Sequence, residues 1–203
     1  MIITIHRGID QIGGCITEIC SKSGTKILID FGHNLPKGGK PSEDKYELPE
    51  ELKNVLEGVS AVIYTHHHGD HIGFAAQIYE QGIPQYMGSV ATVTMKILNA
   101  RMTKVPKLRK QACGNLTALS RFNPYSANVP FNIGDITITP YFVSHSAADA
   151  YMFVIECDGR KVLHTGDFRD HGYLGKGLMK TINGFIKKRL NAKHPWINFT
   201  RSA

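Results

Sequence analysis

The chain has 203 residues, 42% of them hydrophobic and 20% charged, which is typical of a globular domain large enough to bury its own core. No apolar run approaches the roughly 20 residues that span a bilayer, so we expect no membrane span and no small disulfide scaffold. The 24 Lys and Arg exceed the 17 Asp and Glu by seven, and seven basic residues follow Asp170 without any acidic residue. The excess therefore lies in the tail, where it indicates either phosphate binding or an ordinary solvated face.

The first half of the chain alternates between short strands and short helices. Its opening residues alternate as a strand does and lack the basic and apolar regions of a signal peptide, so we expect a cytoplasmic protein. Pro49 and Gly58 bound one helical pattern, and Ser89 is a candidate N-cap for a longer one. The expected elements are a strand at 2–6, a hairpin of strands 15–20 and 25–30, an exposed loop at 36–49, a helix at 49–58, a strand at 60–65, a helix at 72–82, a strand at 84–88 and a helix at 89–104.

The second half is richer in β-forming residues. Residues 104–130 are basic and match no clear period, so they receive no assignment. After them we expect a strand at 135–143, a hairpin over 151–168 that turns at Asp158-Gly159, an amphipathic helix at 175–190 and an irregular end at 191–203. Strands interleaved with helices indicate an α/β (α+β) fold, with a main domain at 1–172 and a basic helix and tail at 173–203.

The segment YTHHHGDHIG places five groups that can hold a metal ion within six positions, directly after a buried strand. His66 and His68 are two residues apart, so their rings can project to the same side, whereas His67 points away and is not expected to be a ligand. Asp70 and His71 follow a glycine that allows the chain to bend toward a second position. Four adjacent ligands fit two neighbouring ions more easily than one.

Imidazole and carboxylate groups are suitable ligands for Zn²⁺ or a similar first-row ion. A pair of such ions lowers the pKa of a bound water toward roughly 7 and so provides hydroxide at neutral pH. The alternative, a polar surface loop that happens to contain histidines, is a poor explanation for H-x-H-x-D-H behind a buried strand.

H-x-H-x-D-H after a hydrophobic strand resembles the signature of the metallo-β-lactamase superfamily, and three further segments match its motifs in order. Asp30 after KILI resembles the first motif, His145 in FVSHSAADAYMF the third, and Asp167 in HTGDF the fourth. The segments around His145 and Asp167 are similar to the β-CASP branch, notably to ribonuclease J-like proteins. The resemblance covers residues 1 to about 172 and implies an αββα sandwich.

The resemblance also implies a role for each matching residue. The implied first-metal ligands are His66, His68 and His145, the second-metal ligands are Asp70 and His71, and Asp167 bridges the two ions. Two Zn²⁺ ions, or Mn²⁺ in their place, are the expected cofactors. Asp70 and Asp167 are the expected catalytic residues, with Asp70 also able to accept or pass on a proton, while Asp30 supports the site without binding metal.

In the family, the fold continues after TGDF and includes a last metal-binding histidine, and ribonuclease J-like members also carry a β-CASP insertion there; neither is recognisable here. The second ion would then have only Asp70, His71 and the Asp167 bridge, because nothing in the context of His171 or His194 supports either as a substitute. We therefore expect a sandwich that is incomplete at its C-terminal side, either because the chain is a fragment of a longer protein or because it is a shortened relative that dimerises. In the second case the exposed sheet edge would allow pairing with a second copy of the chain.

The resulting functional hypothesis is a metal-dependent hydrolase that cleaves phosphodiester bonds by means of a metal-bound hydroxide. RNA is the favoured substrate. Two alternatives stay open: a hydrolase of small thioesters, lactones or β-lactams, and an incomplete metal-binding module without activity.

We expect the remaining histidines and the cysteines to have structural roles. Cys15, Cys20, Cys113 and Cys157 are scattered without a C-x-x-C pair, so we expect them to be free and partly buried. His6, His33 and His164 lie outside the matching motifs, Ser146 is expected to be a surface hydroxyl, and Gly13-Gly14 a tight turn.

Overall fold

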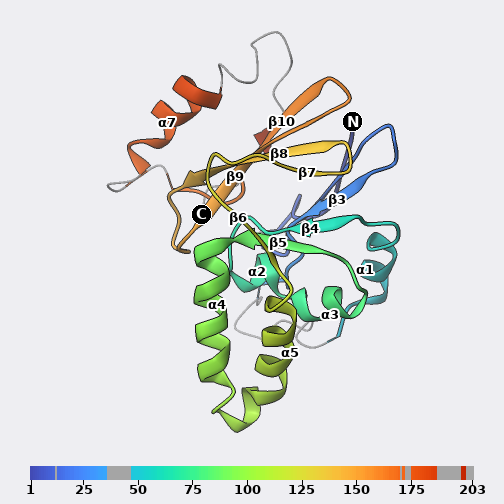
Figure 1. Ribbon diagram of the computed structural model, residues 1–203, viewed down its shortest axis with the longest axis vertical. Helices are drawn as coiled ribbons and strands as arrows, with labels where there is room; N and C mark the ends of the chain where they lie inside the picture. The colour runs from blue at the N-terminus through green and yellow to red at the C-terminus, as the bar shows by residue number, and fades with distance from the viewer. Residues whose placement is uncertain (12, 36–46, 170, 172–174, 187–197, 200–203) are drawn as a thin grey trace.

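The structure is a computed structural model that describes residues 1–11, 13–35, 47–169, 171, 175–186 and 198–199 (Figure 1). Most of the expected loop at 36–49, the end of the expected helix at 187–190 and His194 lie outside these residues.

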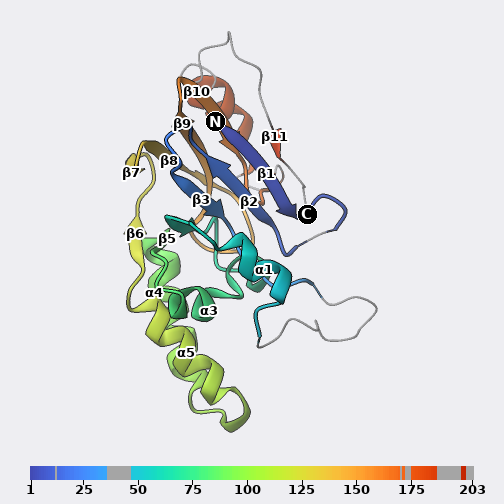
Figure 2. The same cartoon turned by 90° about the vertical axis from the view of Figure 1, so that its right-hand side faces the viewer.

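Two β-sheets form the centre of the molecule (Figures 1 and 2). The first sheet has the strand order β1-β2-β3-β4-β5-β6 and the second the order β11-β10-β9-β8-β7. The strands of the first sheet are β1 (Ile2–Arg7), β2 (Ile16–Cys20), β3 (Lys26–Ile29), β4 (Ala61–Ile63), β5 (Gln85–Gly88) and β6 (Asn123–Tyr125). Those of the second are β7 (Phe131–Ile133), β8 (Ile136–Val143), β9 (Ala150–Cys157), β10 (Arg160–His164) and β11 (Asn198–Phe199).

The first sheet changes from antiparallel to parallel along its width. β1, β2 and β3 form antiparallel pairs, as the expected hairpin requires, whereas β3, β4, β5 and β6 pair in parallel. Each parallel connection contains helices, because a chain must cross over to start the next strand in the same direction. The carboxyl ends of the parallel strands consequently meet at one edge of the sheet, and the histidine cluster follows β4 at that edge.

The crossover helices are α1 (Glu50–Val55), α2 (Gly69–Ile72), α3 (Ala75–Glu80), α4 (Ser89–Met102) and α5 (Arg109–Leu119), with the short 3₁₀ helix η1 (Pro106–Leu108) between the last two. Helices α4 and α5 extend as a hairpin well beyond the sheets (Figures 1 and 2). The unassigned segment 104–130 therefore contributes η1, α5 and β6.

Alternate residues of each strand enter different cores, which is why the strands stack in layers. In β3, Ile27 and Ile29 pack between the two sheets, while Leu28 packs against the helices of the first layer. In β9, Phe153 points toward the other sheet and Val154 points outward, into a cluster that also contains Leu178 of α7 (Leu178–Thr181). Helix, sheet, sheet and helix thus follow one another, which confirms the expected αββα sandwich.

Three local expectations differ from the structure. Ser89 is the first residue of α4 and makes no side-chain cap. The expected helix at 175–190 is confirmed only in part, because α7 passes into the π-helical turn η2 (Ile182–Ile186), where the low helix propensity of Gly184 weakens the regular pattern. The end was expected to be irregular, yet Asn198–Phe199 pairs in parallel with β10, whose edge has backbone groups available to an extended segment.

Candidate metal centre

The loop after β3 holds the candidate metal-binding loop, residues 64–73, in place through backbone contacts. The N–H of Phe31 donates to the carbonyl of His71 at 2.7 Å, and the N–H of His33 donates to the carbonyl of Gly69 at 3.0 Å. Gly32 lies between these two bonds, and a Cβ at this position would lie 1.9 Å from the carbonyl carbon and oxygen of Asp70. Only glycine allows the two loops to approach this closely. Gly32 was not predicted from the sequence, since no local pattern reveals a contact across 38 residues.

Asp30 connects the end of β3 to the metal-binding loop and is 1% exposed. Its carboxylate accepts hydrogen bonds from the N–H of Thr65 at 2.7 Å and from the Thr65 hydroxyl at 2.8 Å. His71 Nδ1 lies 2.8 Å from the same carboxylate. Because a carboxylate accepts but does not donate, Nδ1 carries the proton and His71 Nε2 is the nitrogen left for a metal ion.

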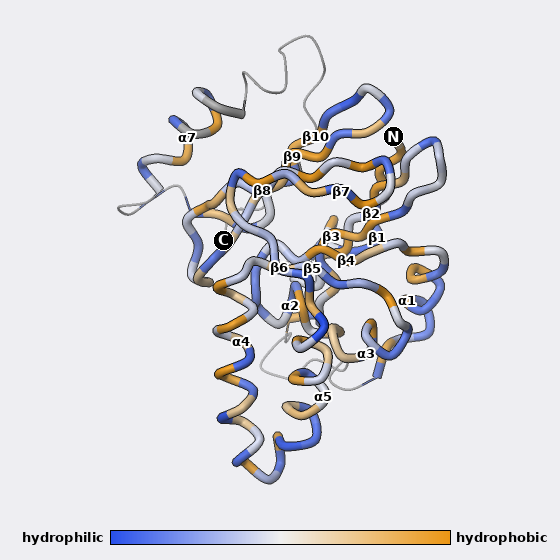
Figure 3. Tube along the Cα trace, viewed as in Figure 1, coloured by the Kyte–Doolittle hydropathy of each residue, from blue (hydrophilic) through white to orange (hydrophobic). Residues whose placement is uncertain are grey.

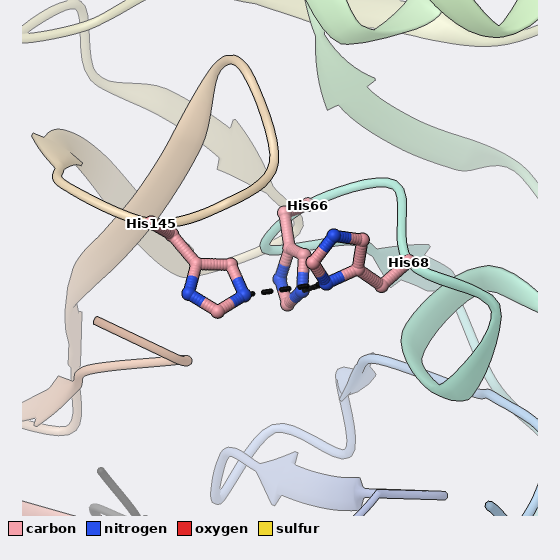
Figure 4. Close-up of side chains that lie close together, drawn as sticks. All are labelled: His66, His68 and His145. Carbon is pink, nitrogen blue, oxygen red and sulfur yellow. Dashed lines mark hydrogen bonds between the residues drawn. The ribbon is translucent and has the colours of Figure 1, made fainter. Parts of the chain in front are cut away.

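Three imidazole rings converge from two loops (Figure 4). His66 Nε2 lies 3.0 Å from His68 Nδ1, and His145 Nε2 lies 3.2 Å from the same nitrogen. His66 and His68 come from the loop after β4, whereas His145 follows β8 in the other sheet. The sandwich therefore brings together residues 77 positions apart in the sequence.

Asp167 lies between the imidazoles of the two motifs. Its Oδ2 is 3.4 Å from His71 Nε2 and 3.8 Å from His145 Nε2, a position suited to a carboxylate that serves two ions. Within the described residues, two sets of three side chains bring their ligand atoms within 4.8 Å of one another: His66, His68 and His145, and His66, His71 and Asp167.

Asp70 was expected to share the second ion with His71. Its Oδ2 lies 3.6 Å from His71 Nε2, but Asp70 belongs to neither set of three. A Cβ on Gly13 would lie 2.7 Å from the same Oδ2, so Gly13 forms the wall beside this carboxylate. Both glycines have positive φ, 75° and 63°, and Gly13 forms a β-bridge with Asn34, so the tight turn stays a prediction. The ligand roles of the six residues stay predictions.

Burial keeps the three converging imidazoles neutral. It lowers the pKa of His66, and the neighbouring His71 and His145 lower it further. Burial is also the main cause of the lowered pKa of His68 and of His145. A neutral imidazole has a free lone pair, so these side chains are in the form that binds metal.

The pKa values of His71 and Asp167 are both shifted so as to favour the charged form of the group, as in an ion pair. Burial alone would lower the pKa of His71, but the carboxylates of Asp30 and Asp167 outweigh it and raise that pKa well above its usual value. Burial likewise would raise the pKa of Asp167, and the His71 charge overcomes this and holds it low. In the absence of a cation, the protonated His71 ring thus balances the carboxylates that surround it.

The donor set fits a metal ion. The buried Nε2 of His71 makes no hydrogen bond of acceptable geometry within the described part of the chain, although two carboxylates face it at 3.4 Å and 3.6 Å. Nitrogen atoms that converge at 3.0–3.2 Å and carboxylates beside them provide the electron pairs of a cation site rather than a complete hydrogen-bond network. Such a centre can bind an anionic substrate and activate water for hydrolysis.

Asp149, which the sequence analysis did not single out, supports the loop that carries His145. Its Oδ2 accepts the N–H of Ala91 at 2.9 Å in the first turn of α4, and its Oδ1 accepts the hydroxyl of Tyr151. Asp149 has a positive φ of 63°, and a Cβ on Gly88 would lie 2.4 Å from its carboxylate. Asp149 thus caps α4 from a distance in place of Ser89.

The other histidines of the described ranges lie outside the two ligand sets. His67 is half-buried, and the centroid of its ring lies 5.9 Å from that of His68. His33 packs edge-on against Phe74, His164 is buried at the end of β10, and His171 is exposed. Ser146 is exposed, as expected of a surface hydroxyl.

All four cysteines are free, as predicted, although Cys113 is exposed. Burial raises the pKa of the Cys15 thiol to about 11.

Comparison with known proteins identifies a family and several relatives. Residues 16–172 match the family model of the metallo-beta-lactamase superfamily. The chain is 25% identical over 178 residues to Ribonuclease J of Helicobacter pylori (strain ATCC 700392 / 26695), covering 83% of this chain and 23% of the relative. It is 28% identical over 167 residues to Exodeoxyribonuclease YycJ of Bacillus anthracis, covering 79% of this chain and 53% of the relative. The chain thus spans about a quarter and about half of these proteins.

Among solved structures, a metallo-beta-lactamase of Cronobacter sakazakii aligns with a TM-score of 0.53 and 15% identity, over 92% of this chain and 74% of that one. A likeness at this identity shows the fold. No helix in the described ranges is long and apolar enough to cross a membrane. With a family match over 157 of 203 residues, a sandwich of the same architecture and a histidine–aspartate cluster at its edge, the chain belongs to the metallo-beta-lactamase superfamily.

Proposed function

We propose that this chain carries the metal centre of a nuclease that hydrolyses phosphodiester bonds, with RNA as its first candidate substrate. The observation that carries the proposal is the convergence of His66, His68 and His145 beside the Asp167–His71 pair. The names of two relatives, a ribonuclease and an exodeoxyribonuclease, favour nucleic acid over other substrates.

Each side chain has a separate task in this proposal. His66, His68 and His145 would hold one ion, Asp70 and His71 would hold a second, and Asp167, which faces His71 and His145, would serve both. Zn²⁺ is the proposed metal, with Mn²⁺ as the alternative, because imidazole and carboxylate donors suit both. Bound ions would supply Lewis acidity, which generates a nucleophile from water and neutralises charge on the phosphate. Asp70 accepts the proton of the attacking water, and Asp30 keeps His71 Nε2 directed at the centre.

Hydrolysis of small thioesters, lactones or β-lactams is the competing enzymatic activity. The same donor set would support it, since the first steps of both reactions use activated water. No described contact identifies a pocket for a particular small ester, whereas the two named relatives act on nucleic acid. We therefore rank this activity second.

Incubation of the purified chain with Zn²⁺ or Mn²⁺ tests the proposal. The substrates are a labelled single-stranded RNA, the same sequence as DNA, bis(p-nitrophenyl) phosphate, and a panel of thioesters, lactones and β-lactams. Cleavage of the phosphodiesters that stops with EDTA and in Asp167→Asn supports the proposal. His6→Gln is the matched control, because His6 lies on β1 and contacts Glu18 rather than the cluster.

Turnover of the esters alone would replace the proposal with the competing activity. Tight binding of metal with no turnover of any substrate would favour the inactive metal-binding module.

A further inference from the structure

The α4–α5 hairpin, residues 89–121, carries a segregated positive charge. Between Glu80 and Asp135 the sequence contains no acidic residue. Seven basic residues fall in this interval: Lys96, Arg101, Lys104, Lys107, Arg109, Lys110 and Arg121. Residues 1–171 contain 17 charges of each sign, so their net charge does not reveal this local excess; all the acidic residues lie outside the interval.

The cations of the hairpin are available to a ligand. Six of the seven are exposed, and Lys96 is half-buried. None of them pairs with a carboxylate in the described part of the chain, and Arg109 donates its Nε–H to the backbone carbonyl of Thr103. The far end of the hairpin is correspondingly hydrophilic in Figure 3. Clustered cations without counter-charges create a positive potential that attracts polyanions.

The hairpin begins beside the metal centre. The first turn of α4 donates the N–H of Ala91 to Asp149, which lies four residues after His145. The 14 residues of α4 extend about 21 Å from this point. A nucleic-acid strand advances about 3.4 Å per phosphate in a duplex, so about six phosphates fit along α4. An anion held on the hairpin would therefore lead toward the cluster of ligands.

The same helix has an exposed aliphatic face. Val90, Val93 and Ile97 are 56%, 56% and 51% exposed at a spacing of three and four residues, and Arg101 and Lys104 continue this face toward the tip. Aliphatic and cationic side chains on one face would also suit an anionic lipid surface. Nucleic acid is the better match, because the cations continue around the tip through η1 and α5 instead of bordering one apolar face, and no exposed aromatic residue contributes an anchor within the hairpin.

We propose that the α4–α5 hairpin binds the sugar–phosphate backbone of a nucleic-acid strand, without sequence preference, and directs the strand to the metal centre. This rests on the proposed nuclease function. Charge complementarity carries it, because phosphate contacts by Lys and Arg supply most sequence-independent affinity.

The test measures binding of a fluorescein-labelled 20-nucleotide single-stranded RNA by fluorescence anisotropy, in EDTA and over a range of salt concentrations. The hairpin variant combines Arg101→Gln, Lys104→Gln, Lys107→Gln and Lys110→Gln. The control variant removes four exposed cations elsewhere, through Lys22→Gln, Lys53→Gln, Arg160→Gln and Lys176→Gln. Each variant loses four positive charges, so a difference in their RNA affinity shows that the position of the charges matters and not only their number. Thermal melts of both establish that they fold.

We expect the hairpin variant to bind RNA at least about 10-fold more weakly than the control variant at 0.1 M salt. Its slope of log affinity against log salt should fall by up to about 3, since each phosphate contact on a single strand contributes about 0.7. Equal binding by the two folded variants would overturn the proposal. So would a hairpin variant that retains RNA binding but loses binding to phosphatidylserine vesicles, which would assign the hairpin to a membrane surface.

The two proposals can fail separately. RNA binding is measured without metal, whereas hydrolysis of bis(p-nitrophenyl) phosphate by the wild-type chain with Zn²⁺ or Mn²⁺ reports on the metal centre. Hydrolysis together with equal RNA binding by both variants rejects only the proposal that the hairpin binds RNA. Hairpin-dependent binding without any hydrolysis rejects only the proposed nuclease function.

Discussion

The carboxylate of Asp30 lies 2.8 Å from Nδ1 of His71, and this contact directs the opposite nitrogen of the ring at the metal centre. The same carboxylate accepts two hydrogen bonds from Thr65, one residue before the first histidine of the cluster. One buried acidic side chain at the end of β3 thus orients both ends of the metal-binding loop.

Replacement of this carboxylate should weaken metal binding. In Asp30→Asn the amide cannot hold His71 and Thr65 in the same way, so we expect metal affinity to fall about 10- to 100-fold, as is usual when the partner of a ligating histidine is removed. Competition with a chromophoric chelator measures the affinity. Asp135→Asn is the control, since Asp135 accepts a hydrogen bond from Ser21 at a turn outside the cluster. Equal affinities for the two variants would contradict this role for Asp30.

Gly32 should tolerate no side chain, although a neighbouring glycine should. A Cβ at Gly32 would lie 1.9 Å from the Asp70 backbone, so Gly32→Ala must separate the two loops, at a cost of about 3 kcal/mol or more in unfolding free energy. Gly69→Ala is the matched control, because a Cβ there meets no atom within 4 Å and its effect should stay within about 1 kcal/mol. Denaturant unfolding compares the two. A smaller loss for Gly32→Ala than for Gly69→Ala would refute the close approach.

Asp149 should affect both the helix and the metal centre. Asp149→Ala removes the acceptor for Ala91 and Tyr151, so we expect a loss of about 1–2 kcal/mol in unfolding free energy, together with weaker metal binding through the loop of His145. Asp149→Asn keeps an acceptor and tolerates the positive φ of 63°, so it should restore most of both properties. Metal affinity unchanged in Asp149→Ala would show that the loop of His145 does not depend on this cap.

The metal-free protein should be most stable close to the usual histidine pKa of 6.5. Burial lowers the pKa of His66, His68 and His145, so below about pH 6.5 the unfolded chain binds protons that the folded chain does not, and stability falls with falling pH. His71 acts in the opposite sense. Its raised pKa contributes stability that is complete below about pH 6.5 and is lost as the pH rises toward the raised value.

Thermal melts in EDTA between pH 5 and 8 measure this dependence. His68→Gln should flatten the acidic side of the curve, because it removes one of the imidazoles whose pKa burial lowers. A melting temperature that rises steadily down to pH 5 in the wild-type chain would contradict the expected sign.

Local sequence was sufficient where neighbours in the chain are neighbours in space. The turn at Asp158-Gly159 was predicted correctly because both residues accept positive φ, 53° and 68°, between arms of β-forming residues. α2 was not predicted as a helix, since its four residues include the expected ligands Asp70 and His71 and have no period of their own. Segment 104–130 gave no period either, because α5 packs through a few small residues such as Ala112.

The sequence by itself determined the chemical inventory of the site: H-x-H-x-D-H in one loop, followed in order by His145 and Asp167. It determined the layers as well, because alternating apolar residues commit each strand to two opposite cores. Only the tertiary structure decided which nitrogen of each ring faces the centre, that Gly32 must lack a side chain, and that Asp149 caps a helix 58 residues away. These contacts depend on how the two sheets pack, and packing joins residues whose separation along the chain has no local pattern.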